Sequence, residues 1–170
     1  MPVKPLPPRA LVRELLSYDD ESGVFTWLAR SGETWWNSRY AGKIAGSVKS
    51  DGHIEVSIGH SLYKAHRLAW LYMRGEPVPD LIDHEDRDKA NNRWGNLREA
   101  TKSQNGANMR LRSSNTTGIK GTGVLKGRHR ARIMLDGKEH HLGYFDTLEE
   151  AAVARREAAE RLHGEFARHG

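Results

Sequence analysis

The sequence predicts an α+β protein in which short strands and a few helices form two consecutive parts. Apolar residues alternate with polar ones at Ile54, Val56 and Ile58, as in a strand with one buried face. Thr101–Gln104 and Thr147–Glu150 both have the Ser/Thr-x-x-Glu/Gln pattern that caps the start of a helix. The hydrophobic period also changes after residue 117. We therefore expect two small folding units rather than one large core.

The first part begins with a proline-rich leader and continues as a β-rich segment. Helical spacing predicts helices at Ala10–Leu16 and at His66–Arg74, the second ended by Gly75. Strand patterns are found at Val24–Trp27, Ile44–Val48, His53–Ile58 and Leu62–Ala65.

Three aromatic side chains of this part have two interpretations each. Trp35 and Trp36 lie in residues 31–41, which show no clear period, and act either as packing anchors or as contacts to a nucleic acid. His66 either packs or caps its helix or lies near a metal ion.

The composition excludes several classes of protein. The chain of 170 residues has no cysteine, which excludes disulfides and zinc sites with cysteine ligands. No segment approaches the ~20 apolar residues that a membrane-spanning helix needs. The N-terminus lacks the apolar core of a signal peptide. We therefore expect a soluble protein of the cytoplasm with no membrane partner.

Positive charge is concentrated in the C-terminal part. The formal net charge is +5, and residues 108–170 hold 12 basic against 8 acidic side chains. Within residues 110–135 there are seven lysines or arginines and no acidic residue. Such a one-sided block favours binding to a polyanion, most often a nucleic acid. The alternative is a solvated surface without a partner.

The segment Leu81–Asn105 contains the residues with the most specific chemistry. Asp83-His84 is followed by Asn96-Leu97-Arg98 and then by Ser103-Gln104-Asn105. Apolar pieces on both sides of a polar loop predict a strand, a long loop and a second strand, and Thr101 predicts the helix that carries Asn105. This order can bring a carboxylate, an imidazole and an amide oxygen together around a hard cation.

This segment resembles the HNH nucleases, whose ββα-metal motif has the same three positions. The resemblance implies hydrolysis of DNA phosphodiester bonds at a catalytic site formed by Asp83, His84, Asn96 and Asn105. Asp83 and Asn105 are then the ligands of a divalent metal ion, Mg²⁺ or Mn²⁺, and His84 is the general base. Asn96 tethers the loop through backbone hydrogen bonds, and Arg98 reaches a phosphate.

Two features of the segment differ from the common family pattern. The third position is Asn105 rather than histidine, a variant of the homing-type branch. The loop Glu85–Asp88 adds acidic charge near the expected phosphate. An alternative without function is a turn-rich loop in which Asp83, Asn91, Asn92 and Asn96 only satisfy backbone groups.

The C-terminal part predicts three strands and one helix. The strand candidates are Gly118–Leu125, His129–Leu135 and Lys138–Tyr144, and Asp136-Gly137 is a two-residue hairpin turn. After Thr147 an apolar stripe continues at helical spacing; it consists of Leu148, Ala151, Ala152, Ala159, Leu162 and Phe166.

This part resembles the AP2 DNA-binding domain. The resemblance rests on Asn115–Gly121, Ala131–Ile133, His141–Gly143, Phe145–Thr147, Glu150–Ala152 and Leu162–Gly164. It implies that the three-stranded sheet enters the major groove of double-stranded DNA. The DNA-binding residues expected here and in the neighbouring segments are Lys120, Arg128, Arg130, Arg132, His141, Arg98, Arg110 and Arg112. His129 stands where the family usually has tryptophan.

Together these observations predict a nuclease part at residues 1–109, a linker at 110–117 and an AP2-like part at 118–170. Residues 1–107 also look like phage-encoded HNH proteins, which implies an endonuclease of homing type acting in the cytosol of the host cell. One site per chain predicts a monomer that nicks DNA and uses no small-molecule cofactor. The alternatives are a non-cleaving, sequence-specific DNA-binding regulator and, less favoured because strand 128–135 lacks exposed aromatics, an RNA-binding protein.

Overall fold

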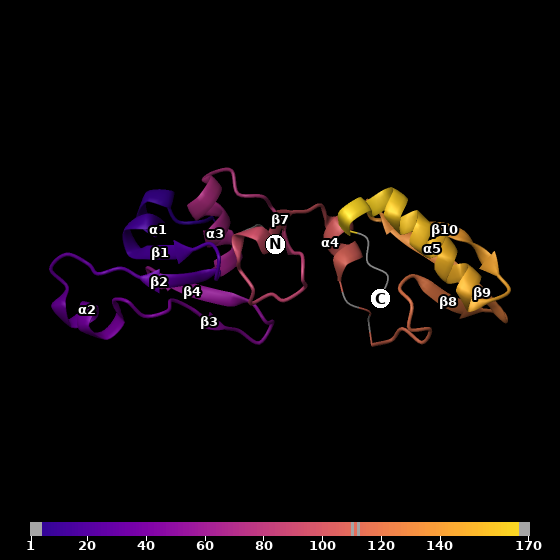
Figure 1. Ribbon diagram of the computed structural model, residues 1–170, viewed down its shortest axis with the longest axis horizontal. Coiled ribbons are helices and arrows are strands. Elements are labelled where there is room, and N and C mark those ends of the chain that lie inside the picture. The colour runs from indigo at the N-terminus through magenta and orange to yellow at the C-terminus, as the bar shows by residue number, and fades with distance from the viewer. Residues whose placement is uncertain (1–4, 110, 112, 167–170) are drawn as a thin grey trace. The chain divides into compact units, whose positions relative to one another are not determined.

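A computed structural model describes residues 5–109, 111 and 113–166 of the chain (Figure 1). The chain divides into two compact units, Met1–Glu99 and Ala100–Gly170. The predicted linker, residues 110–117, lies within the second unit. Two predicted DNA contacts, Arg110 and Arg112, lie outside the described residues.

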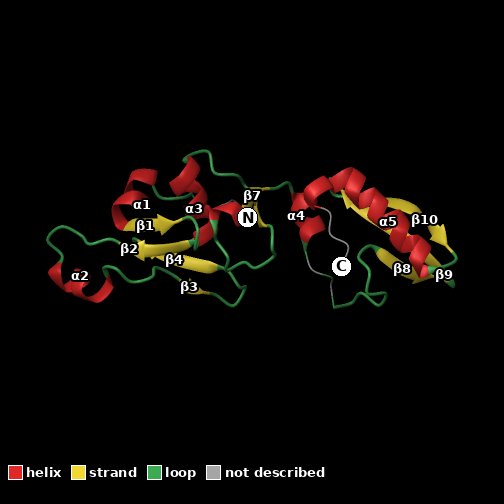
Figure 2. Cartoon of the chain, in the orientation of Figure 1, coloured by secondary structure: helices red, strands yellow, loops and turns green. Residues whose placement is uncertain are grey.

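The first unit consists of short helices and small antiparallel sheets (Figure 2). Its sheets pair β1 with β2, β4 with both β3 and β5, and β6 with β7. The elements are α1 (Arg9–Leu15), β1 (Leu16–Asp19), β2 (Val24–Trp27), α2 (Thr34–Tyr40), β3 (Ser47–Val48), β4 (Ile54–Ile58), β5 (Ser61–Lys64), α3 (Ala65–Arg74), β6 (Ile82–His84), the 3₁₀ turn η1 (Trp94–Asn96) and β7 (Leu97–Glu99).

The core of the first unit forms where α1 and α3 pack against each other and against the sheets. Val12, Leu16, Val56, Leu68 and Leu71 are fully buried, which confirms the two predicted helices and the buried face of β4. A core built from α1 to β7 fixes the β6–β7 hairpin, because Ile82 and Leu97 belong to the same cluster.

Three predictions for the first unit need correction. The helix α2 forms where no period was found, because its Trp36 ring packs on Trp27 and under the Arg30 guanidinium rather than in a core. The strand β1 follows α1 without a break and was missed. The strand predicted at Ile44–Val48 is reduced to β3, with a single bridge at Ile44.

The second unit contains a capped helix, a three-stranded antiparallel sheet and a long helix. Its elements are α4 (Lys102–Asn108), β8 (Thr122–Leu125), β9 (Arg128–Leu135), β10 (Lys138–Phe145), α5 (Leu148–His163) and the 3₁₀ turn η2 (Gly164–Phe166), with sheet order β10-β9-β8. Both predicted capping boxes are present, at Thr101 and at Thr147.

The hairpin between β9 and β10 turns at Asp136-Gly137, as predicted, with φ values of 50° and 77°. These two positive angles fit a type I′ turn. The helix α5 packs on the sheet, where Ala131 and Ile133 are buried beneath it. The strand β8 is shorter than predicted, because Gly118 and Gly121 have positive φ values and the chain turns there before pairing begins.

The architecture is therefore mixed α+β with small antiparallel sheets, as the sequence predicts. The β6–β7 hairpin belongs to the first unit and α4 to the second, so their packing as one ββα core stays a prediction. Within the described part of the chain, no helix is both long enough and apolar enough to cross a bilayer.

Candidate active site

The β6–β7 hairpin holds the Asp-His pair of the first unit. Asp83 pairs with Arg98 and His84 with Leu97 in the antiparallel register. Both Asp83 and His84 are 5% exposed. Successive strand residues point to opposite faces, and the two side chains accordingly have different partners.

The His84 ring is oriented by the buried amide of Asn92. The Asn92 Nδ2 donates to the Ala90 carbonyl, which leaves Oδ1 facing the His84 Nε2 at 3.3 Å. An amide oxygen only accepts, so Nε2 carries the proton and Nδ1 keeps the lone pair. His84 is thus held in the tautomer that can accept a proton at Nδ1.

Asn92 is itself held by the β1–β2 hairpin. The Tyr18 hydroxyl donates to the Asn92 carbonyl at 2.6 Å. Burial, assisted by Asp20 and Asp19, raises the pKa of Tyr18, so the phenol keeps its proton for this bond. Gly23 lies so close that a Cβ there would come within 2.4 Å of the Asn92 backbone. Two segments far apart in sequence therefore fix the partner of His84.

Asn96 ties the loop after β6 to β7. Its Oδ1 accepts from the Asp86 backbone, and its Nδ2 donates to the Asp86 carboxylate and to the Asn91 carbonyl at 2.8 Å. The Asn96 carbonyl also accepts from the Glu85 backbone. These bonds are the tether that the sequence predicts for Asn96, and they close the acidic loop.

Asp83 forms an ion pair with Arg98. Both the Nε and Nη2 of Arg98 lie about 3 Å from the Asp83 Oδ2, at 3.1 and 3.0 Å. The two side chains are only 6% and 15% exposed. Arg98 was predicted to contact a phosphate. Its guanidinium instead forms hydrogen bonds to Asp83, the predicted metal ligand.

Two further histidines surround His84. The ring centroids of His66 and His84 are 5.1 Å apart, and that of His53 lies 5.2 Å from His66 and 6.0 Å from His84. One ligand atom from each ring lies within 4.8 Å of the others. We refer to His53, His66 and His84 as the histidine cluster.

Burial favours the neutral form of the three rings of the histidine cluster. It lowers the pKa of His84, against the opposite influence of Asn92 and nearby carboxylates. It lowers the pKa of His53, and it lowers that of His66 furthest, with neighbouring histidines and cations adding to the effect. A neutral imidazole is the form that accepts a proton or binds a metal ion.

Asn105, the third motif residue, lies in α4 of the second unit and is half-buried. The Thr101 hydroxyl accepts from the Gln104 backbone, and the Gln104 side chain accepts from the Thr101 backbone. This capping box fixes the start of the helix that carries Asn105.

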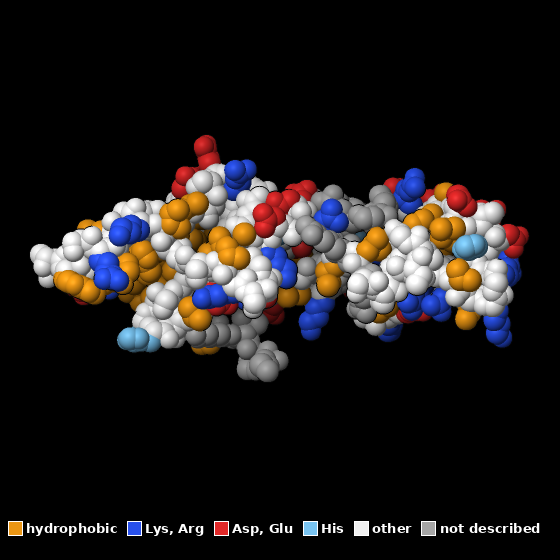
Figure 3. Space-filling model, turned by 90° about the horizontal axis from the view of Figure 1, so that it is seen from below, with side chains coloured by type: hydrophobic (Ala, Val, Ile, Leu, Met, Phe, Trp, Pro, Cys, Tyr) orange, Lys and Arg blue, Asp and Glu red, His pale blue; other side chains and the backbone are white. Residues whose placement is uncertain are grey.

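The predicted DNA-binding side chains of β9 and β10 share the face of the sheet opposite α5. The register places His141 opposite Arg132 and Tyr144 opposite Arg130. Arg128 lies near Asp146, and Arg132 forms an ion pair with Glu139. Lysine and arginine side chains stand out from the surface of the second unit (Figure 3).

Lys120 has a different environment from the arginines. Its Nζ lies 2.6–2.9 Å from the carbonyls of Gly106, Ala107 and Met109, at the C-terminal end of α4. A cation there satisfies helix carbonyls that have no partner in the helix. Lys120 therefore holds α4 and the loop before β8 together.

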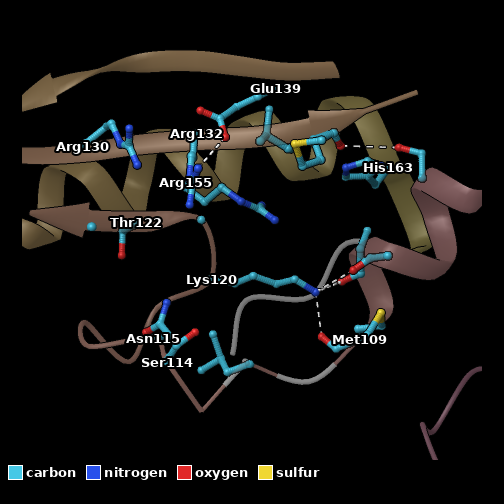
Figure 4. Close-up of a pocket in the computed structure, with 18 of the residues that line it drawn as sticks. Met109, Ser114, Asn115, Lys120, Thr122, Arg130, Arg132, Glu139, Arg155 and His163 are labelled. Carbon is cyan, nitrogen blue, oxygen red and sulfur yellow. Dashed lines mark hydrogen bonds and ion pairs between the residues drawn. The ribbon is translucent and has the colours of Figure 1, made fainter. Parts of the chain in front are cut away.

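A basic pocket opens beside Lys120 (Figure 4). Its cavity volume is about 790 Å³, and its charged lining residues are Lys102, Lys120, Arg130, Arg132, Glu139 and Arg155, with His163 beside them. Arg155 is only 5% exposed, and its Nε and Nη1 have no hydrogen-bond partner in the part of the chain that the structure describes. The pocket can therefore accept an anion.

The family comparison identifies the class of the protein. A family model described as HNH endonuclease matches residues 63–107, which run from β5 through the β6–β7 hairpin to α4. The chain accordingly contains an HNH endonuclease domain and is an enzyme that cleaves DNA.

Two curated viral proteins are similar to the chain. Protein 3.8 of Escherichia phage T7 is 39% identical over 113 residues, which is 62% of this chain and 92% of that protein. An uncharacterized HNH endonuclease, L560 of Acanthamoeba polyphaga mimivirus, is 36% identical over 114 residues, which is 66% of this chain and 59% of that protein. No solved structure matches the chain significantly. The chain belongs to the family of protein 3.8.

Sequence reasoning missed several residues of the site. Asn92 was interpreted only as a loop amide, and Tyr18 and His53 were not singled out. The sequence could have indicated Asn92, because it lies in the polar loop that follows His84. Tyr18 and His53 have no local signal, since they reach the site only through tertiary packing.

Proposed function

We propose that the enzyme hydrolyses DNA backbones with His84 as the general base and with the help of a divalent metal ion. The observation that carries the proposal is the contact between the His84 Nε2 and the Asn92 Oδ1. His84 lies inside the segment that matches the HNH endonuclease family. The Asn92 Oδ1 accepts a hydrogen bond from Nε2–H, so the neutral His84 ring has its lone pair at Nδ1. This is the protonation state that a base needs near neutral pH.

The chemical step follows from this geometry. His84 accepts a proton at Nδ1 from a water molecule, whose oxygen forms a bond to the phosphorus. The bond from phosphorus to one bridging oxygen breaks, and that oxygen leaves with a proton from solvent. The Asn92 carboxamide stabilises the imidazolium, because its oxygen accepts from Nε2–H in both protonation states of the ring.

The residues present fit a hard divalent ion. Carboxylate and amide oxygens are the donors that Mg²⁺ or Mn²⁺ prefers, and Asp83 and Asn105 would hold such an ion. A bound ion supplies positive charge where the phosphorane and the leaving oxygen become negative. Arg98 forms an ion pair with Asp83 and so keeps this buried carboxylate in place.

DNA binding falls to the second unit in this proposal. Arg128, Arg130, Arg132 and His141 line the sheet face away from α5 and would read the major groove as in AP2 domains. The carbonyl contacts of Lys120 support a structural role for it, and the basic pocket supports a phosphate contact through Arg155. Arg110 and Arg112 would add contacts to the phosphate backbone of the DNA.

A single histidine base per chain favours nicking by a monomer, as in an enzyme of homing type. The test incubates the protein with supercoiled plasmid in Mg²⁺, in Mn²⁺ and in EDTA. Conversion to open circles in either metal and none in EDTA is expected. The mechanism is wrong if EDTA leaves the rate unchanged, and the monomeric nicking enzyme is wrong if linear plasmid forms without an open-circle intermediate. A chain that shifts duplex mobility but leaves the plasmid supercoiled in both metals would instead be a regulator.

A further inference from the structure

The histidine cluster contains more metal-binding groups than the proposed mechanism uses. His53 lies just before β4, His66 lies in the first turn of α3, and His84 ends β6. Folding thus brings three imidazoles together from separate elements, with one ligand atom of each within 4.8 Å of the others. The mechanism above uses His84 alone.

His66 provides an independent sign of a missing partner. It is 7% exposed, and its Nδ1 is buried without a hydrogen-bond partner among the described residues. A buried polar atom left unpaired costs on the order of 1–3 kcal/mol, so such atoms usually have a partner that packing alone does not reveal. A metal ion bound by the His66 ring would be such a partner.

His53 has the support that metal-binding histidines commonly have. Its Nδ1 lies 3.0 Å from the Asp51 Oδ2, and the Lys64 Nζ lies 2.9 Å from that carboxylate oxygen and 3.1 Å from the Nδ1 itself. When Nδ1–H donates to Asp51, the lone pair is left at Nε2. A carboxylate behind the imidazole fixes the ring and raises its basicity as a ligand.

We propose that His53, His66 and His84 form a binding site for a transition-metal ion of the Zn²⁺ class, and that this ion inhibits cleavage by occupying His84. Three neutral imidazoles are a donor set for Zn²⁺, Co²⁺ or Ni²⁺, whereas Mg²⁺ prefers oxygen. The binding site stands on the geometry alone. The inhibition rests on the proposed function, in which the same nitrogen of His84 is the base.

The geometry requires only small movements. Nitrogen ligands about 2.1 Å from a tetrahedral ion lie roughly 3.4 Å apart, so ligand atoms now within 4.8 Å of one another would approach by about 1.4 Å or less. A water or hydroxide would complete the shell. The carboxylates that act on the three rings would offset the charge of a bound ion; they are Asp51, Asp83, Asp86 and Asp88. The cations Lys64, Arg67 and Lys89 would oppose it.

The first experiment measures binding of Zn²⁺ alone to the full chain by isothermal titration, with Co²⁺ absorption as a spectroscopic check of tetrahedral nitrogen ligation. One ion per chain is expected. His53→Gln, His66→Gln and His84→Gln should each weaken binding by at least ~10-fold, and Asp51→Asn by ~10–100-fold. His60→Asn is the matched control, because His60 is exposed in a turn of the same unit with a positive φ that asparagine tolerates.

Asp83→Asn separates this site from the oxygen site of the proposed mechanism. It should leave Zn²⁺ binding within a few-fold of the parent. The proposal is overturned if the parent binds no stoichiometric Zn²⁺, if the three cluster variants bind as tightly as the parent, or if Asp83→Asn and not His66→Gln removes binding. Circular dichroism of each variant identifies loss of binding through unfolding, and a variant that unfolds is replaced by its asparagine counterpart.

The second experiment adds Zn²⁺ to plasmid nicking in Mg²⁺, with the rate of each variant without Zn²⁺ as its own reference. The parent and His60→Asn should lose activity as Zn²⁺ saturates the cluster, and His53→Gln should resist. Equal inhibition of parent and His53→Gln would contradict inhibition through the cluster. A parent that nicks nothing in Mg²⁺ or Mn²⁺ would refute the proposed function but leave the Zn²⁺ titration to decide the metal site.

Discussion

The two units differ in how deeply their charged and titratable side chains are buried. In the first unit Asp83, His84 and His66 are buried, and the hydrogen-bond partners Arg98 of Asp83 and Asn92 of His84 come from the same unit. In the second unit Arg128 and Arg132 are about half exposed, and their ion pairs lie at the surface. A base needs a fixed ring and a controlled protonation state, whereas DNA binding needs accessible positive charge. The difference implies that equivalent substitutions have unequal effects in the two units.

The largest expected difference is between two arginine-to-glutamine substitutions. Arg98→Gln leaves the buried Asp83 without its counter-charge and should lower the free energy of unfolding by about 3–5 kcal/mol. Arg132→Gln breaks the exposed pair with Glu139 and should change it by at most about 1 kcal/mol. Urea unfolding of both variants measures this. Equal values would mean that the Asp83–Arg98 pair is not effectively buried.

The same Arg98 variant also tests the metal site. If an ion binds at Asp83, Mg²⁺ should restore part of the lost stability of Arg98→Gln, because the ion replaces the missing positive charge. Thermal unfolding with Mg²⁺ and with EDTA gives the shift. No Mg²⁺ dependence of the variant would count against Asp83 as a ligand.

The next largest effect concerns the support of the base by the β1–β2 hairpin. In Gly23→Ala the new Cβ would lie 2.4 Å from backbone atoms of Asn92 and Arg93. The clash should cost about 1–3 kcal/mol beyond the strain of a positive φ and should slow cleavage by displacing Asn92 from His84. Gly32→Ala is the control, since Gly32 has φ +76° but nothing within 4 Å. Equal losses of stability and cleavage rate in both variants would mean that the strain of the positive φ alone explains the effect, without a clash at Asn92.

A smaller effect follows from the protonation of His66. Burial, with His84 and His53 adding to it, lowers the pKa of His66 in the folded chain to about 2 from the ordinary 6.5. The unfolded chain then binds more protons below pH 6.5, so stability is full above that pH and falls as the pH decreases. One such histidine makes the free energy of unfolding fall by up to ~1.4 kcal/mol for each pH unit below 6.5.

His66→Asn should therefore reduce the dependence of unfolding free energy on pH between 6.5 and 4.5. Denaturant midpoints at several pH values measure it. His60→Asn, which changes an exposed histidine outside the cluster, should keep the parental slope. If the unfolding free energy of His66→Asn depends on pH as steeply as that of the parent, His66 is accessible to protons in the folded chain.

The smallest effect per residue is expected on the exposed sheet face. Replacing Arg128, Arg130 and Arg132 by alanine should flatten the salt dependence of DNA affinity by about one unit of slope per lost phosphate contact. Loss of a base contact should cost ~1–3 kcal/mol at one position of the target only. Binding titrations at several salt concentrations on target and scrambled duplexes separate these effects. Unchanged affinity on both duplexes would remove β9 as the binding surface.

Local patterns predicted much of the fold. Alternation at Ile54, Val56 and Ile58, the Asp136-Gly137 turn and both capping boxes were found as expected, because each depends on neighbours in sequence. The helix α2 was missed because it buries none of its residues and is held by aromatic and cation–π contacts. Such contacts leave no hydrophobic period in the sequence.

The site was predicted only as far as its motif extends. The spacing of Asp83, His84 and Asn96 identified the β6–β7 hairpin and the tether of its loop. Tyr18 and His53 lie 30 or more residues before the Asp83-His84 pair, and tertiary packing alone brings them to the site. Motif spacing therefore predicts the base but not the groups that set its tautomer and pKa.

The division of labour between the two units is tested most directly by measuring two quantities on one duplex. These are the single-turnover cleavage rate at saturating protein and the dissociation constant, for His84→Ala and for the variant with Arg128, Arg130 and Arg132 changed to alanine. We expect His84→Ala to lose ~10²–10⁴ in rate with unchanged affinity, since the base acts on water. The triple variant should lose affinity and keep the saturating rate. If both variants lose the same quantity, or if His84→Ala cleaves at the parental rate, cleavage and binding are not divided in this way.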